Sequence, residues 1–107
     1  MGWIGVDLDG TLAKYESWEK NGETIGEPVP EMLFRVKNWV VNGKTVKIFT
    51  ARASVSDQIP PIKEWCKKHG LGDLEVTNVK DFGMIELWDD RAVAVEMNTG
   101  RVLGGAK

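Results

Sequence analysis

The chain has 107 residues and a mass of 11.9 kDa, which leaves room for one domain around one core. Apolar residues make up 42% of the chain and charged residues 28%, a balance that excludes long disorder. The net charge of −2 and the isoelectric point near 5.4 exclude a general electrostatic attraction to nucleic acid or anionic membranes. We therefore expect a single domain over residues 1–107.

A single cysteine, Cys66, excludes an intrachain disulfide and suits a reducing compartment. The chain opens directly into a strand-like apolar run, with no basic region before it, so no secretory signal is expected. No apolar run approaches the roughly 20 residues that a membrane-spanning helix needs. The expected location is cytoplasmic, with no membrane partner.

The first expected elements are a buried strand and a short flap. Residues 3–8 form an apolar run that ends in carboxylates and Gly10, a pattern typical of a strand leading into a tight loop. The polar stretch 12–28 has Asn21-Gly22 at its middle, a common signal for a two-residue hairpin turn. We predict a flap here; the alternative is a surface loop in which Trp18 covers the core.

Helical and extended patterns then alternate, with proline before and glycine after each helical pattern. The expected elements are a helix over 31–42, a strand over 45–49, a helix from Pro60 to Gly70, strands over 74–76 and 85–88, and a terminal hairpin over 92–103. This order predicts an α/β fold, namely a Rossmann-like parallel sheet with helices on both faces.

Polar side chains follow the carboxyl ends of the predicted strands, which meet at one edge of a parallel sheet where ligands bind. They are Asp7, Asp9, Gly10 and Thr11 after the first strand, Thr50 and Arg52 after the second, Asp89 and Asp90 after the strand at 85–88, and Lys80 before that strand. Their convergence is the informative feature, because a lone Asp-x-Asp is usually a turn or a solvated face.

The residue types suit a magnesium-dependent phosphate site. Clustered carboxylates without nearby His or Cys ligands favour Mg²⁺ over zinc, and Asp7, Asp89 and Asp90 supply such oxygens. The backbone carbonyl of Asp9 is expected to reach the same ion. A threonine hydroxyl can donate a hydrogen bond to a phosphate oxygen, and a lysine can place a positive charge beside it.

Asp7 and Asp9 stand two residues apart, so both side chains can point into one site. A carboxylate nucleophile at Asp7 would accept a phosphoryl group as an acyl phosphate. A second carboxyl at Asp9 would protonate the leaving oxygen and later deprotonate water. This division of labour requires Asp9 to keep a proton that Asp7 lacks.

Four segments, in order along the chain, resemble the motifs of the haloacid dehalogenase superfamily of phosphohydrolases. They are Asp7-Leu8-Asp9-Gly10-Thr11-Leu12, Ile48-Phe49-Thr50-Ala51-Arg52, Lys80, and Leu87-Trp88-Asp89-Asp90-Arg91. The resemblance implies a phosphatase, a phosphoric monoester hydrolase that uses Mg²⁺. It implies the following roles: nucleophile Asp7, acid/base Asp9, phosphate binding by Thr50, Ala51, Arg52 and Lys80, and metal binding by Asp7, Asp9, Asp89 and Asp90.

The resemblance also bears on the substrate. The flap over 12–28 is too short to be the large cap domain that many members place over small substrates. Capless members act on large substrates or have subunits that cap one another, so a homo-oligomer is compatible with this chain. The second and fourth motifs are also similar to those of the phosphatase domain of phage polynucleotide kinase, which implies a nucleotide or a polynucleotide 3′-phosphate as substrate.

Several assignments stay open. Lys80 stands closer to the last strand than a third-motif lysine commonly does, so Lys44, Lys47 or Arg52 are alternatives. Arg52 and Arg91 suit ion pairs with the acidic edge as well as contacts with substrate. Two other functional classes remain, a receiver-like phosphoacceptor and an inactive binding module that keeps the fold. Magnesium-dependent release of phosphate would separate an enzyme from both.

Overall fold

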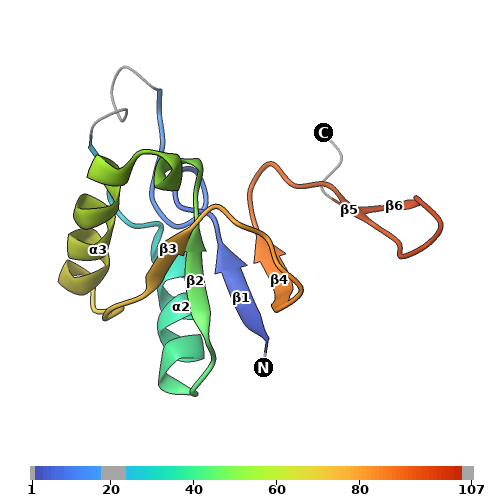
Figure 1. Cartoon of the computed structure of the whole chain (residues 1–107), viewed down its shortest axis with the longest axis horizontal. Helices are drawn as coiled ribbons and strands as arrows, with labels where there is room; N and C mark the ends of the chain where they lie inside the picture. Colours follow the sequence, from blue (N-terminus) through green and yellow to red (C-terminus); the bar gives the residue numbers. More distant parts are fainter. Residues whose placement is uncertain (1, 18–23, 105–107) are drawn as a thin grey trace.

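A computed structural model describes residues 2–17 and 24–104 of the chain. Its elements (Figure 1) are β1 Trp3–Val6, α2 Pro30–Val41, β2 Val46–Phe49, the 3-10 helices η1 Ala51–Ser54 and η2 Ser56–Gln58, α3 Ile59–Lys68, β3 Glu75–Thr77, β4 Met84–Trp88, β5 Ala94–Val95 and β6 Val102–Gly104. The predicted order of helices and strands is therefore present.

Four strands form a parallel sheet in the order β3-β2-β1-β4. Ile4 lies opposite Val46 on β2 and opposite Glu86 on β4, and all three strand pairs are parallel. The carboxyl ends of β1, β2 and β4 consequently reach the same edge of the sheet. This is the α/β architecture with a parallel sheet that the sequence predicts, and it is compatible with a Rossmann-like fold.

The main core lies on one face of this sheet. Its strand residues alternate along the chain, as side chains on one face of a strand must. The buried core comprises Ile4, Val6, Val46 and Ile48 from the strands, Met32 and Val36 from α2, Ile62, Trp65 and Cys66 from α3, and Leu8, Leu12, Ala13, Leu71 and Leu74 from connecting segments. Both helices therefore pack on the same face, and the prediction of helices on both faces is not confirmed in the described residues.

Proline and glycine mark the helix ends where the sequence placed them. Pro30 occupies the first turn of α2, where its missing N–H costs no hydrogen bond. Gly43 and Gly70, just past the two helices, have φ of +78° and +82°, a region that favours glycine. Within the described part of the chain, no helix is both long enough and apolar enough to span a membrane.

Trp3 covers the other face of the sheet and is itself held by polar contacts. Its indole Nε1 donates a hydrogen bond to Asp81 Oδ1 at 2.8 Å, from the loop between β3 and β4. The Lys47 ammonium lies 4.5 Å from the centre of the Trp3 ring. Among the described residues, Trp3 therefore packs on this face with Phe49, Lys47 and the loop between β3 and β4, and not with a helix.

The base of the 12–28 segment is paired. Ala13 forms an antiparallel bridge with Pro28, and the amide of Lys14 donates to the carbonyl of Glu27 at 2.8 Å. Trp65 of α3 donates from Nε1 to the Gly26 carbonyl at 3.0 Å, which ties this base to the helix layer. The predicted Asn21-Gly22 turn and Trp18 lie outside the described residues.

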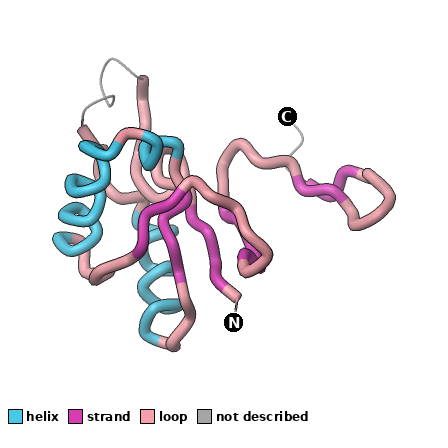
Figure 2. The backbone as a smooth tube through the Cα atoms, viewed as in Figure 1, coloured by secondary structure: helices cyan, strands magenta, loops and turns pink. Residues whose placement is uncertain are grey.

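The segment expected to form a terminal hairpin, 92–103, contains the antiparallel strands β5 and β6. Asn98 at φ +69° and Gly100 at φ +80° make the reversal between them. Figure 2 shows this hairpin standing away from the four-stranded sheet, joined to it through the residues that follow β4.

Val36→Ala and Val41→Ala test which surface of α2 is buried. Val36 is fully buried, whereas Val41 is 81% exposed near the end of the same helix. We expect Val36→Ala to lower the free energy of unfolding by about 2 kcal/mol, from lost burial and the cavity left behind. Val41→Ala should change it by less than about 0.5 kcal/mol. Urea unfolding followed by circular dichroism measures both, and equal costs would contradict the placement of the core.

Candidate functional site

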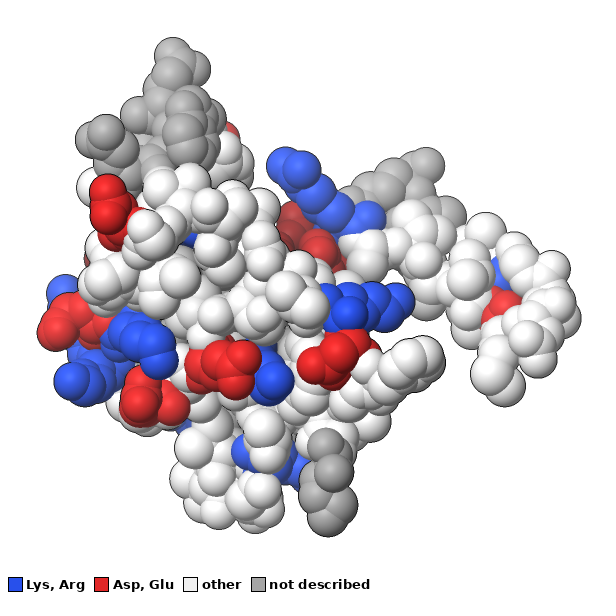
Figure 3. Space-filling view, viewed as in Figure 1, with Lys and Arg blue, Asp and Glu red and all other residues white. Residues whose placement is uncertain are grey.

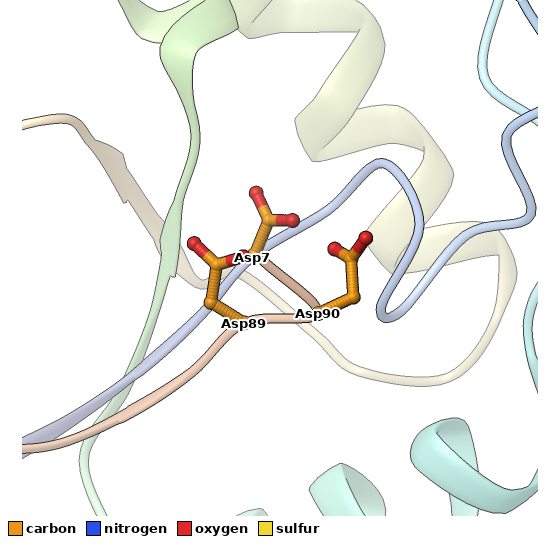
Figure 4. Close-up of side chains that lie close together, drawn as sticks. All are labelled: Asp7, Asp89 and Asp90. Atoms are coloured by element: carbon orange, nitrogen blue, oxygen red, sulfur yellow. The ribbon is translucent and has the colours of Figure 1, made fainter. Parts of the chain in front are cut away.

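Three carboxylates meet where β1 and β4 end. Asp7 directly follows β1, and Asp89 with Asp90 directly follows β4. One oxygen from each lies within 4.8 Å of the others (Figure 4). The amide of Asp7 donates to the Trp88 carbonyl at 2.9 Å, so the pairing of β1 with β4 continues up to the cluster. The parallel register therefore brings these three side chains together.

The cluster is electrostatically stressed in the absence of a cation. The pKa of Asp7 is raised from 3.8 to about 7, first by burial, then by the charge of Asp89, and further by a hydrogen bond and the charge of Asp90. The backbone N–H of Leu8 acts in the opposite direction. A divalent cation would relieve this repulsion, and a donor set of carboxylate oxygens alone fits Mg²⁺.

Thr11 and Gly10 fix the position of Asp90. The Thr11 hydroxyl donates to Asp90 Oδ1 at 2.9 Å and accepts from the Asp90 amide at 2.9 Å. Gly10 has φ of +91°, and a Cβ there would lie 2.8 Å from Asp90 Oδ2. Only glycine allows the loop after β1 to approach the Asp90 carboxylate this closely. The Asp-Gly-Thr sequence thus joins the two acidic loops.

Asp9 forms a bidentate ion pair with Arg52. Arg52 Nε donates to Asp9 Oδ2 at 2.7 Å, and its Nη2 donates to Asp9 Oδ1 at 2.8 Å. Arg52 is only 8% exposed. It also donates to the side chain of Gln58 and to the Thr24 carbonyl, both at 3.1 Å. Of the two roles left open by the sequence, this geometry is that of an ion pair with the acidic edge.

Thr50 is buried at the end of β2 and caps η1. Its hydroxyl oxygen accepts from the amide of Arg52 at 3.1 Å, and its own amide donates to the Thr77 carbonyl. The hydroxyl hydrogen can therefore serve a ligand oxygen. Capping and ligand binding are compatible here, because the first uses the oxygen of Thr50 and the second uses its proton.

The acidic cluster opens into a cavity of about 830 Å³. Its lining combines acidic, polar and apolar side chains from the loops at this edge of the sheet: Asp7, Asp9, Gly10, Tyr15, Phe49, Thr50, Ala51, Arg52, Ser54, Val55, Gln58, Asn78, Asp89, Asp90 and Arg91. Every residue to which the sequence resemblance gives a catalytic, phosphate-binding or metal-binding role belongs to this lining, except Lys80. The volume is large enough for a nucleotide-sized ligand.

Lys80 is exposed in the loop between β3 and β4 and is not part of the described lining. Lys47, one alternative, packs over Trp3 and pairs with Glu75. Among the described residues, two cationic side chains line the cavity: Arg52, which is paired with Asp9, and Arg91, which follows Asp90 in the chain.

Sequence reasoning missed Asn78, which also lines the cavity. It directly follows β3, which ends at Thr77 and not at residue 76 as expected. The rule that functional residues follow the carboxyl ends of parallel strands would have found Asn78 if that strand end had been placed correctly.

Comparison of the chain with protein-family models, with curated proteins and with solved structures gave no match.

Arg52→Gln tests the ion pair with Asp9. Removing one partner of a largely buried pair leaves the other uncompensated, so we expect a loss of about 3 kcal/mol in the free energy of unfolding. Arg91→Gln, at an exposed arginine of the same cavity, should cost less than about 0.5 kcal/mol. Chemical denaturation of the wild type and both variants measures the free energy of unfolding. A loss for Arg52→Gln no larger than for Arg91→Gln would show that the pair of Arg52 with Asp9 contributes little to stability.

Asp7→Asn tests the stress within the cluster. The pKa of Asp7 is higher in the folded chain, about 7, than the ordinary 3.8, so the folded state binds more protons between these values. Stability without metal should therefore fall as pH rises from about 4 to about 7 and then level off. Asp7→Asn removes this term. In EDTA, we expect the unfolding midpoint of the variant to increase relative to that of the wild type as pH rises from 5 to 8. A difference in midpoint that stays constant over this range would contradict the raised pKa of Asp7.

Proposed function

We propose that the protein is a magnesium-dependent phosphomonoester hydrolase in which Asp7 is the nucleophile. One observation carries the proposal, namely that the Asp7 carboxylate lies beside Asp89 and Asp90 on an open cavity whose wall includes Thr50 and Arg91. The order of the four sequence motifs supports the same reading. Together they join an oxygen-rich cation site to donors for a phosphate group.

Asp7, Asp89 and Asp90 would hold the Mg²⁺ ion, because their oxygens already lie close together and include no nitrogen or sulfur donor. When bound, Mg²⁺ would neutralise the carboxylates and the charge of an incoming phosphoryl group. Thr11 keeps Asp90 in place for this task through its two hydrogen bonds.

The first chemical step forms a bond between an Asp7 carboxylate oxygen and phosphorus while the bond from phosphorus to the leaving oxygen breaks. Thr50 donates its hydroxyl hydrogen to a phosphoryl oxygen, and Arg91 supplies positive charge from the opposite loop. We assign the phosphate-binding cation to Arg91; Lys80 joins it only if the loop between β3 and β4 moves. The leaving oxygen takes a proton from Asp9.

In the second step, water attacks the phosphorus of the acyl phosphate and Asp9 accepts its proton, which releases phosphate and restores the Asp7 carboxylate. Arg52 is suited to hold Asp9 for this base role, because its two N–H groups fix both oxygens. A proton on Asp9 would replace one of these bonds. The acid role in the first step therefore requires Asp9 to turn away from Arg52.

We further propose that the site works without a large cap domain, because only the 12–28 segment stands between β1 and the core helix that follows. The open cavity has Tyr15 and Phe49 in its lining, and these rings can stack on a planar base. A nucleotide or a polynucleotide 3′-phosphate is the substrate class that we favour. Figure 3 shows acidic and basic side chains interspersed over the face in view. This mixture favours binding of a nucleotide or of the end of a nucleic acid over binding of a long polyanion.

Phosphate release from a panel of phosphomonoesters, with Mg²⁺ or with EDTA, tests the proposal. The panel comprises nucleotides, sugar phosphates and 3′-phosphorylated oligonucleotides. We expect turnover with Mg²⁺ only, highest on nucleotide or 3′-phosphorylated substrates. Asp7→Asn should reduce kcat by at least about 10³-fold, because the amide is nearly isosteric but a poor nucleophile.

Asp73→Asn provides the matched control, because Asp73 is exposed and pairs with Lys63 away from the cavity. It should keep the wild-type rate. Absence of turnover on every substrate, from folded protein that binds Mg²⁺, would contradict the enzyme and favour a receiver-like or binding role.

A further inference from the structure

Exposed apolar side chains are concentrated in the last third of the chain. Of the thirteen large hydrophobic side chains that are exposed among the described residues, nine lie between residues 79 and 103. Three lie in β4 or in the loop directly before it and form what we call the β4 surface: Phe82, Ile85 and Leu87. Five belong to the arm, residues 91–104: Val93, Val95, Met97, Val102 and Leu103. A soluble domain seldom leaves so much apolar surface in one region, which points to a partner.

The arm lacks support from its own domain. Among the described strands, β5 and β6 pair only with each other, in a sheet separate from the main one. An isolated two-stranded hairpin is marginally stable in water. Figure 1 shows the arm reaching away from β4, and the radius of gyration is 14.1 Å, against about 13 Å for a compact chain of this length. The arm is therefore placed to contact another molecule.

The β4 surface offers a complementary target. Strand β4 stands at the end of the sheet order, so its outer edge is unpaired among the described strands. Phe82, in the loop that leads into β4, is fully exposed, and Ile85 is 64% exposed. An unpaired edge flanked by apolar side chains is a template for an added strand.

Charge favours contact of the arm with the β4 surface over contact of two like surfaces. Outside the acidic cluster, residues 79–88 contain two acidic side chains and one lysine, whereas the arm contains two arginines and one glutamate. Two β4 surfaces placed together would repel each other. An arm against a β4 surface brings opposite net charges together, with Val95 and the other apolar side chains between them.

We propose that two copies of this chain form a two-fold symmetric dimer in which the arm of each copy packs on the β4 surface of the other. A reciprocal exchange satisfies both surfaces and closes the assembly, as a two-fold axis requires. The inference does not depend on the proposed function, because it concerns residues outside the acidic cluster.

Sedimentation equilibrium of the full chain tests the dimer. We expect a mass twice that of the 11.9 kDa chain. Val95→Glu in the arm and Phe82→Lys in the β4 surface should each weaken the dimer by at least about 100-fold in Kd, because each places a charge of the repelling sign in the interface. Leu103→Glu and Ile85→Lys provide a second pair at the same two surfaces.

Mixing the variants tests the exchange itself. A mixed dimer of Val95→Glu and Phe82→Lys chains contains one contact with wild-type residues on both sides, and one contact in which the new glutamate and lysine attract each other. We expect the 1:1 mixture to form dimers when neither variant does alone. If mixing the two variants does not restore dimers, the result would contradict a reciprocal exchange. It would indicate instead that each surface contacts the same surface of the other copy.

Phe34→Lys and Val41→Glu are matched controls, because both residues are exposed on α2, away from the proposed interface. They should leave the mass unchanged, and circular dichroism should show every variant folded. A wild-type monomer at about 100 μM, well above the Kd of a specific dimer, would overturn the proposal. In that case, amide hydrogen exchange would distinguish an arm packed on its own sheet from an arm left for a different partner.

Discussion

The hydrogen bonds between Thr11 and Asp90 are the interaction on which the site depends. They join the loop after β1 to the loop after β4, at the point where two adjacent parallel strands end. Gly10 makes this junction possible, because any side chain there would collide with the Asp90 carboxylate. The junction keeps the loops that carry Asp7 and Asp90 side by side, with their carboxylate oxygens close together. The fold therefore holds together charges that, without a cation, oppose one another.

The same edge of the sheet holds two acids in different environments. Asp7 sits among other carboxylates, which together with burial raise its pKa to about 7, and it has the surroundings of a cation ligand. Asp9 points to Arg52, which is tied in turn to Gln58 and to the backbone of Thr24. Two aspartates separated by one residue thus have two different partners. In the proposed mechanism, the nucleophile role requires Asp7 to be ionised, which a cation on the cluster would favour, and the acid role requires Asp9 to leave its ion pair with Arg52.

Much of the fold was predictable because its signals are local. Proline and glycine punctuation predicted α2 and α3, and the apolar runs predicted the strands. The layer arrangement was not predictable in this way, since both helices pack against Ile4, Val6 and their neighbours, and the opposite face relies on Trp3 and the Asp81 loop. The convergence of the acidic residues at one edge of the sheet was predictable, because the carboxyl ends of parallel strands meet there. The pairing of Arg52 with Asp9, across 43 positions, depends on tertiary packing that no local pattern encodes.

Trapping the acyl phosphate at Asp7 tests the central claim most directly. Protein mixed with substrate and Mg²⁺ would be quenched and reduced with borohydride, which converts an aspartyl phosphate to homoserine, and then digested for peptide mass spectrometry. The account predicts homoserine at position 7, dependent on both substrate and Mg²⁺, and none at position 9. Phosphate release without a trapped residue at position 7, or with the label on another aspartate, would contradict it.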